Sequence, residues 1–245
     1  MYKISIGLGK IRKMQIELNL ENINKKLRNK EINFITIDGI ACSGKTLFSN
    51  ILKKKIKNSL LISKDIFLLP RIIRIKITKS LKKKSLYNQN IVHYDLIKLK
   101  LLISFLLKGN KKNKLVLKKL YNRKSGINNL TQVFHFKKKR LIIFEGIYSN
   151  EDIKKIIKPS IKILITENVY TSLFRKVERI RDKKISIQNV VIEFIKIHLT
   201  SYLKYLKKNH FDLAYSYLSK KFIISKNGKS NQINDIKKFL QKHVN

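Results

Sequence analysis

The sequence predicts an α/β fold in which a mainly parallel β-sheet is flanked by helices, giving three layers. First, short and strongly apolar runs alternate along the chain with longer segments of helical periodicity. Second, the runs at residues 33–38, 60–63, 141–146 and 161–166 have the length and apolar character of parallel strands buried on both faces. Third, 245 residues with 43% hydrophobic content are enough for one large domain with a sizeable core.

The most informative segment follows the strand at residues 33–38. It fits the pattern G-x-x-x-x-G-K-[ST] of a phosphate-binding loop, and its residues are Gly39, Ile40, Ala41, Cys42, Ser43, Gly44, Lys45 and Thr46. Glycines let the loop curl so that its N–H groups face an anion, and a helix running to about residue 57 would add its positive N-terminal end. Lys45 is placed to reach the β- and γ-phosphates, and the Thr46 hydroxyl to bind Mg²⁺. Glycine is scarce, with 8 in 245 residues, so a chance match to this pattern is improbable. We therefore predict a P-loop NTPase-type fold.

Basic residues far outnumber acidic ones: 56 Lys and Arg against 15 Asp and Glu give a formal charge of +41. Such a charge would suit a nucleic acid or an anionic membrane as partner. However, lysine is spread from end to end, and the wealth of Lys, Ile, Asn and Leu is typical of an AT-rich coding sequence. We therefore interpret the charge as compositional drift with at most non-specific attraction to nucleic acid, and we expect a self-repulsion that salt relieves.

The single cysteine, Cys42, excludes an internal disulfide and is compatible with a reducing compartment. No apolar run is long enough to cross a membrane, and the N-terminus lacks the apolar core of a signal peptide. We therefore expect a cytoplasmic protein without a membrane partner. Residues 1–32 form a basic lead-in with weak patterning, so the P-loop domain is expected to span residues 33–245.

Two acidic residues stand where apolar strands end. Asp65 follows the strand at residues 60–63, and Glu145 ends the run at 141–146 just before a glycine. Ligands bind at the carboxyl ends of parallel strands, so Asp65 is a candidate catalytic and metal-binding acid and Glu145 a candidate Mg²⁺ ligand, directly or through water. The alternatives are a helix N-cap or lysine-paired surface acid at Asp65, and a structural acid that binds the phosphate loop at Glu145.

The middle of the chain contains weaker patterns. Residues 71–92 are basic and irregular, and no element is expected there. A helix is expected at residues 95–108, because leucines share one face of it and Gly-Asn follows. Asp95 is either the N-cap of that helix or a substrate ligand. Residues 115–121 predict a strand, and residues 122–126 a turn.

The last third of the chain is expected to be largely helical. A helix at residues 168–183 carries Arg175, Arg179 and Arg181, of which the first two share a face. Arginines aimed at a transferring phosphoryl group stabilise its charge, although a solvated helix face is the commoner role for any one of them. The remaining expected elements are a long helix at 186–208, a strand near 222–225 and a final helix at 231–243.

These pieces, in this order, resemble the uridine kinase/phosphoribulokinase family of P-loop kinases over about residues 33–226. The segments that match the motifs of that family are residues 39–46, 61–67, 144–147, 175–176, 181–182 and 212–213. The resemblance implies that Asp65 is the catalytic base, that Glu145 helps to bind magnesium, and that Tyr121 contacts a pyrimidine. It also implies lid arginines at the positions of Arg175 and Arg181.

The departures from that family concern the acceptor. Leu68 replaces the tyrosine of the family's Asp-x-Phe-Tyr motif, so one aromatic contact to the base is missing. The segment that grips the ribose is reduced to residues 93–95, which makes His93 and Asp95 substrate candidates, although ungapped counting puts Gln89 at the ribose-binding aspartate. The turn at Asn122 lacks the family's aspartate. The resemblance therefore implies ATP and Mg²⁺ more firmly than it implies uridine.

The expected activity is ATP-dependent phosphorylation of a small-molecule hydroxyl, first of all the 5′-hydroxyl of uridine or cytidine. In that expectation Lys45 contacts the phosphates, Thr46, Asp65 and Glu145 organise Mg²⁺, and a lid arginine closes over the developing charge. The alternatives are a kinase of another small acceptor such as pantothenate or glycerate, a nucleic-acid-associated ATP-binding protein, and a weakly active relative that has lost its substrate contacts. The sequence is compatible with a homo-oligomer.

Overall fold

A six-stranded sheet forms the centre of the computed structural model, which describes residue 23 and residues 32–80, 93–108, 113–123, 125–137, 140–153, 156–180 and 186–244. In the order in which they lie side by side, its strands are β2 (Ser59–Ser63), β5 (Arg140–Glu145), β1 (Ile32–Gly39), β6 (Ile161–Thr166), β7 (Leu213–Ser216) and β8 (Lys221–Ile223). All neighbouring pairs are parallel except β7 and β8, which are antiparallel. The predicted α/β fold with a mainly parallel sheet is confirmed.

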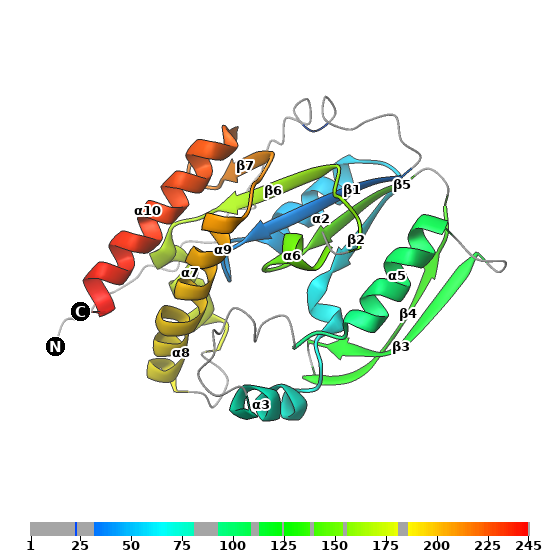
Figure 1. The fold of residues 1–245 in the computed structure, drawn as a ribbon, viewed down its shortest axis with the longest axis horizontal. Helices are drawn as coiled ribbons and strands as arrows, with labels where there is room; N and C mark the ends of the chain where they lie inside the picture. The colour runs from blue at the N-terminus through cyan, green and yellow to red at the C-terminus, as the bar shows by residue number, and fades with distance from the viewer. Residues whose placement is uncertain are drawn as a thin grey trace.

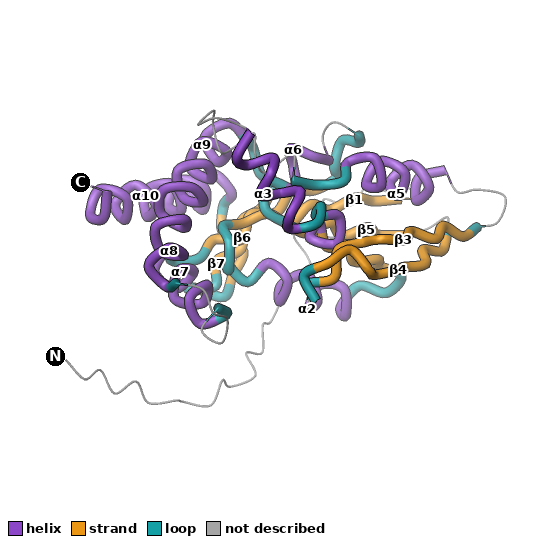
Figure 2. Tube along the Cα trace, turned by 90° about the horizontal axis from the view of Figure 1, so that it is seen from below, coloured by secondary structure: helices purple, strands orange, loops and turns teal. Residues whose placement is uncertain are grey.

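Helices cover both faces of this sheet and extend beyond its two ends (Figures 1 and 2). They are α2 (Lys45–Lys55), α3 (Arg71–Ser80), α5 (Leu96–Lys108), α6 (Ser149–Ile153), α7 (Val169–Glu178), α8 (Ile187–Glu193), α9 (Thr200–Lys208) and α10 (Ser225–Val244), with a 3-10 turn η1 (Lys64–Phe67) and a π-helical turn η2 (Phe194–Leu199). Helices α7 to α10 gather at one end of the molecule, and α5 lies at the other end beside the separate antiparallel pair β3 (Lys114–Asn122) and β4 (Ile127–His135).

The side chains of the central strands point alternately to two cores. In β5, Ile142 and Phe144 pack toward α5, whereas Ile143 packs toward Phe48 of α2 on the opposite face. Every one of these side chains is almost fully buried. Strands that are apolar on both faces are what the continuous apolar runs of the sequence predict.

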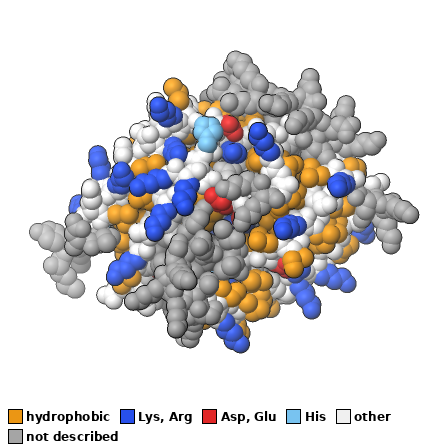
Figure 3. Space-filling model, viewed as in Figure 1, with side chains coloured by type: hydrophobic (Ala, Val, Ile, Leu, Met, Phe, Trp, Pro, Cys, Tyr) orange, Lys and Arg blue, Asp and Glu red, His pale blue; other side chains and the backbone are white. Residues whose placement is uncertain are grey.

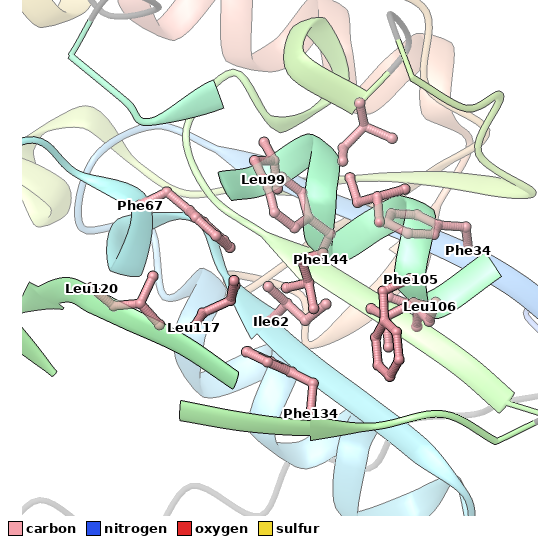
Figure 4. Packing of buried hydrophobic residues seen from close by; sticks show 14 residues of the cluster. Phe34, Ile62, Phe67, Leu99, Phe105, Leu106, Leu117, Leu120, Phe134 and Phe144 are labelled. Atoms are coloured by element: carbon pink, nitrogen blue, oxygen red, sulfur yellow. The ribbon is translucent and has the colours of Figure 1, made fainter. Parts of the chain in front are cut away.

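The core next to the expected active-site strands is built from three elements (Figure 4). Helix α5 and the β3–β4 pair close over the sheet there, and the labelled side chains point toward one another. The labelled members of the cluster are Phe34, Ile62, Phe67, Leu99, Phe105, Leu106, Leu117, Leu120, Phe134 and Phe144. Phe67 belongs to η1, so this packing fixes the turn that carries Asp65.

Several elements differ from the expectation. Helix α3 occupies the first part of residues 71–92, which were expected to be irregular; residues 81–92 lie outside the described part. Its isoleucines Ile72, Ile73 and Ile75 are exposed, so it shows no clean buried stripe that a pattern search could detect. Strand β4 was not expected after the turn because it is polar and half exposed, and its pairing with β3 decides its structure.

The C-terminal helices and strands also differ from the expected ones. Helix α7 ends at Glu178 instead of continuing to residue 183, and residues 181–185 are not described. The expected helix at 186–208 contains the π-helical turn η2, strand β7 precedes the one expected strand, and α10 begins at Ser225 instead of 231. β7 is only four residues long, and its pairing with β6 stabilises it.

Of the lead-in at residues 1–32, the structure describes Ile23 and Ile32. Ile23 is fully buried in the core on the α2 face, and Ile32 begins β1. The rest of the lead-in lies outside the described residues, so its boundary at residue 32 stays a prediction. None of the helices in the described ranges combines the length and apolar character that crossing a membrane would require.

Candidate active site

Two glycines shape the loop between β1 and α2. Gly44 has a φ of +90°, in the left-handed region, and a Cβ there would lie 2.7 Å from the ring of Tyr217. At Gly39 a Cβ would lie 2.8 Å from the carbonyl oxygen of Ile165. A larger residue at either position would therefore collide with its surroundings. Tyr217, which no sequence motif marks, donates its hydroxyl to the Gly44 carbonyl at 2.8 Å and braces the loop from the β7–β8 connection.

Lys45 begins α2 and turns its side chain back over the loop. Its Nζ donates to the carbonyl oxygens of Gly39 and Ile40 at 2.9 and 2.8 Å. Burial lowers the pKa of Lys45, and the charges of Glu145 and Asp38 oppose that shift. A phosphate in the loop would give Nζ a charged acceptor in place of two carbonyls, and hydrogen bonds to charged acceptors are stronger. The loop therefore fits a nucleotide phosphate.

Thr46 and Glu145 meet from the start of α2 and the end of β5, with 3.5 Å between Thr46 Oγ1 and Glu145 Oε2. Burial raises the pKa of Glu145, and a hydrogen bond with Ser63 opposes the shift. A hydroxyl and a carboxylate suit Mg²⁺, which takes few protein ligands and completes its shell with water and phosphate oxygens. The described residues contain no group of three or more His, Cys, Asp and Glu side chains that could hold a metal ion. The pair thus fits a metal shared between protein and nucleotide.

Asp65 lies on η1, directly after the carboxyl end of β2. Its Oδ2 is 3.3 Å from Nη1 of Arg123, and both side chains are partly exposed. The preceding residue, Lys64, anchors the turn: its fully buried Nζ is 2.5 Å from Asp152 Oδ2 and donates to the Ile147 carbonyl at 2.8 Å. These contacts hold Lys64 in the protein interior, and the neighbouring Asp65 is left partly exposed at the carboxyl edge of the sheet.

These residues line one cleft of about 730 Å³ at the carboxyl edge of the sheet. Lys45, Thr46, Asp65 and Glu145 all contribute to its wall, together with residues of α3, α7 and the β3–β4 connection. The strands that end here are β1, β2 and β5, which are neighbours in the sheet. The structure therefore brings together the loop and both acids that the sequence placed at strand ends.

Comparison with known proteins supports the architecture. No protein-family model matches the sequence, and no curated protein matches it significantly. Among solved structures, a protein of Silicibacter sp. TM1040 assigned as a fructose transport system kinase superposes with a TM-score of 0.59 at 16% identity, covering 79% of this chain and 95% of that chain. A protein of Bacillus stearothermophilus assigned as a uridine kinase gives 0.52 at 14%, covering 76% and 87%. D-glycerate 3-kinase of Cryptococcus neoformans gives 0.53 at 13%, covering 83% and 94%.

The chain shares the fold of these kinases. This confirms, at the level of the fold, the resemblance inferred from the motifs.

A further carboxylate, Asp38, lies beneath the phosphate loop and was not among the predicted site residues. It is fully buried and accepts hydrogen bonds from the Tyr205 hydroxyl at 2.5 Å, the Gly39 N–H at 2.7 Å and the Ser149 hydroxyl at 3.2 Å. Burial raises the pKa of Asp38, and the hydrogen bond from Tyr205 opposes that shift. Asp38 does not line the cleft and therefore positions the loop against α6 and α9. In the sequence, Asp38 could have been identified as an acidic residue at the end of an apolar strand.

The predicted lid arginines have different surroundings. Arg175 on α7 donates from Nη1 to Glu167 Oε2 at 2.8 Å, and the same atom lies 3.5 Å from the Cys42 carbonyl, so Arg175 braces the phosphate loop from outside. Arg179, just after α7, lines the cleft. Arg181 lies outside the described residues. Of the two described arginines, Arg179 is the one whose side chain reaches the cleft.

Of the residues predicted to bind the acceptor, the structure sets one in the cleft wall and two outside it. His93 lines the cleft, whereas Asp95 and Tyr121 are not part of its wall. Asp95 accepts from the Lys98 N–H at 3.0 Å and pairs with Lys98 Nζ at 3.0 Å, which is the capping role given above as the alternative. Tyr121 accepts a hydrogen bond from Arg74 at 3.4 Å and reaches the cleft only through that residue. Contacts of Asp95 and Tyr121 with an acceptor stay predictions.

Several titratable residues of the cleft wall were not among the predicted site residues, namely Arg74, Arg123, Lys176, Glu193 and His198, although Lys176 belongs to the matched motif at residues 175–176. Arginine is rare in this lysine-rich chain, and that rarity is the sequence feature that could have marked Arg74 and Arg123 as candidate site residues. No comparable sequence feature marks Glu193 or His198. The π-helical turn η2 brings residues five apart together, so that His198 Nε2 lies 3.0 Å from Glu193 Oε1.

Proposed function

We propose that this protein transfers the γ-phosphoryl group of ATP to a hydroxyl of a small molecule. The observation that carries the proposal is that one cleft joins a phosphate-binding loop, a hydroxyl–carboxylate pair suited to Mg²⁺ and a partly exposed acid, Asp65. The fold shared with kinases named for fructose transport, uridine and D-glycerate supports a small acceptor.

In this proposal Asp65 accepts the proton of the acceptor hydroxyl while that oxygen forms a bond to the γ-phosphorus. The bond between the γ-phosphorus and the bridging oxygen breaks, and ADP leaves with its electron pair. Lys45 and the loop N–H groups hold the phosphates in line, and Arg179 balances the developing charge. Thr46 and Glu145 would hold Mg²⁺, which when bound neutralises phosphate charge. Positioning and electrostatics supply most of the rate.

The acceptor that the sequence resemblance implies is the 5′-hydroxyl of uridine or cytidine, with pantothenate and glycerate as alternatives. The nucleic-acid alternative has less support. Figure 3 shows Lys and Arg side chains scattered over the viewed face among hydrophobic and neutral ones. A nucleic-acid-binding protein gathers its basic residues in a patch or stripe, whereas the described Lys and Arg side chains of this face are interspersed with hydrophobic and neutral ones.

The test is transfer of radiolabelled phosphate from ATP, with Mg²⁺, to a panel of nucleosides, pantothenate and glycerate, with RNA as a control. We expect a labelled small product with the unaltered protein and none with Lys45→Met, which lacks the cation at the phosphates. If no small acceptor is labelled while RNA accelerates ATP hydrolysis, the kinase proposal is wrong and a nucleic-acid-associated activity takes its place.

A further inference from the structure

The cleft wall on the acceptor side of Asp65 carries two arginines from different elements. Arg74 comes from α3 and Arg123 from the turn between β3 and β4, and both line the cleft. Arg123 lies 3.3 Å from Asp65. Both arginines therefore stand where the molecule that receives the phosphoryl group would have to lie.

Arg74 is held in place by fixed contacts. Its Nε donates to the Leu69 carbonyl at 2.9 Å, and its Nη2 donates to the Tyr121 hydroxyl at 3.4 Å, with the guanidinium carbon 5.3 Å from the centre of the Tyr121 ring. The adjoining chain is tied to the β3–β4 pair, since Asn128 donates to the Leu68 carbonyl at 2.9 Å. A guanidinium oriented in this way is prepared for a ligand without a large loss of side-chain freedom.

The choice of arginine is informative in this chain. Only nine of its 56 Lys and Arg residues are arginine, yet three of the five Lys and Arg residues that line the cleft are. Lysine would supply the same charge, whereas the planar guanidinium binds carboxylate and phosphate groups with two parallel hydrogen bonds. We propose that the acceptor carries a carboxylate or phosphate group that Arg74 and Arg123 bind. This inference rests on the proposed kinase function and narrows its acceptor.

The ion pair between Arg123 and Asp65 gives the anionic group a second effect. Both side chains are partly exposed, 64% for Arg123 and 36% for Asp65, and pairs of that kind are held weakly. An anionic acceptor draws Arg123 away from Asp65 and leaves the carboxylate ready to accept the hydroxyl proton. An uncharged nucleoside offers Arg123 no competing anion, so Asp65 stays paired.

The experiment compares related acceptors with and without an anionic group. Glycerol is matched with glycerate and glycerol 3-phosphate, and panthenol with pantothenate, while uridine and cytidine represent uncharged nucleosides. We expect kcat/KM for an anionic acceptor to exceed that of its uncharged match at least about tenfold. Whichever of glycerate and glycerol 3-phosphate has the higher kcat/KM shows whether the site prefers a carboxylate or a phosphate group.

Variants then assign the effect to the two arginines. Arg74→Gln and Arg123→Gln should each lower kcat/KM for the anionic acceptor about tenfold or more, mainly through KM, and leave the KM for ATP unchanged. Arg71→Gln is the matched control, because Arg71 lies exposed on the same helix and outside the cleft wall. Arg123 lies in an exposed turn, so its variant keeps the test valid even where Arg74→Gln impairs folding.

Two results would overturn the inference while leaving the kinase function intact. One is a nucleoside or other uncharged acceptor that is phosphorylated as well as the anionic ones. The other is an anionic acceptor whose kcat/KM both arginine variants leave unchanged. If the protein binds ATP but labels no acceptor of either kind, the proposed function itself fails, and this inference is rejected with it.

Discussion

Asp65 carries the proposed chemistry at the scale of single residues. Asp65→Asn keeps the size of the side chain but removes the proton acceptor, so we expect turnover to fall about a hundredfold or more. ATP affinity should stay within a few-fold, because Asp65 is not part of the phosphate loop. Single-turnover phosphoryl transfer together with nucleotide-binding titration separates the two quantities. Unchanged turnover would remove Asp65 from the role of base.

Asp38 predicts a pH dependence of stability. Burial raises its pKa above the ordinary 3.8, so the folded state holds the proton more tightly than the unfolded state. The free energy of unfolding should therefore fall as pH rises from the ordinary pKa toward the folded one, and then level off. Each pH unit between the two pKa values contributes about 1.4 kcal/mol.

The comparison that isolates Asp38 is with Asp38→Asn, which cannot ionise. Urea unfolding of both proteins between about pH 4 and 8 should show the unaltered protein losing stability relative to the variant as pH rises. Any constant effect of the substitution cancels in this trend. A difference that is the same at every pH would contradict the assignment.

At the scale of elements, the ion pair between Lys64 and Asp152 joins η1 to α6. Both side chains are buried, with exposures of 0% and 1%. Lys64→Met leaves Asp152 buried without its cation, so we expect it to lower the free energy of unfolding by about 3–5 kcal/mol. The double variant Lys64→Met/Asp152→Leu should recover much of this loss. Urea unfolding of the unaltered protein, Lys64→Met, Asp152→Leu and the double variant measures the coupling, and additive effects would show that the pair does not act as a unit.

A second contact between elements links the β7–β8 connection to the phosphate loop. The Tyr217 hydroxyl donates to the Gly44 carbonyl, and Tyr217→Phe removes that hydrogen bond while keeping the ring. We expect ATP affinity to fall about two- to tenfold, because the loop loses one of its supports. Tyr170→Phe is the control, since its hydroxyl contacts His243 on α10 instead of the loop. Equal affinity of the Tyr217→Phe protein and the control would show that the loop is rigid without this bond.

At the scale of the whole molecule, the charge of +41 sets the response to salt. Like charges repel one another over about 10 Å at 0.1 M salt, and this distance shortens as salt is added. We therefore expect Tm to rise steadily between about 0.05 and 0.5 M NaCl, and short polyanions to raise it at lower concentration. Thermal unfolding with NaCl and with polyphosphate measures both effects. A Tm that does not respond to salt would show that the basic side chains are too far apart to interact.

The sequence by itself determined the features that depend on local pattern. Buried strands and amphipathic helices repeat over short windows, so the core strands and α5 were predicted almost residue by residue. The phosphate loop is a contiguous motif whose glycines are required by its geometry. The positions of Asp65 and Glu145 follow from a rule of topology, that parallel strands share one carboxyl edge. Elements with a weak pattern, such as α3, β4 and β7, were missed.

Only the tertiary structure decided which side chains meet. Asp38 and Tyr205 are 167 residues apart and form a hydrogen bond because α9 packs over the end of β1. Arg74 comes from α3, which the sequence did not predict, and Arg123 from the predicted turn after β3, and the fold sets both against one cleft. Asp95 makes a local helix-cap contact with Lys98, whereas the fold also sets His93 in the cleft wall. Such contacts depend on long-range packing that no local window of sequence contains, which is why the acceptor side of the site became visible only in the folded chain.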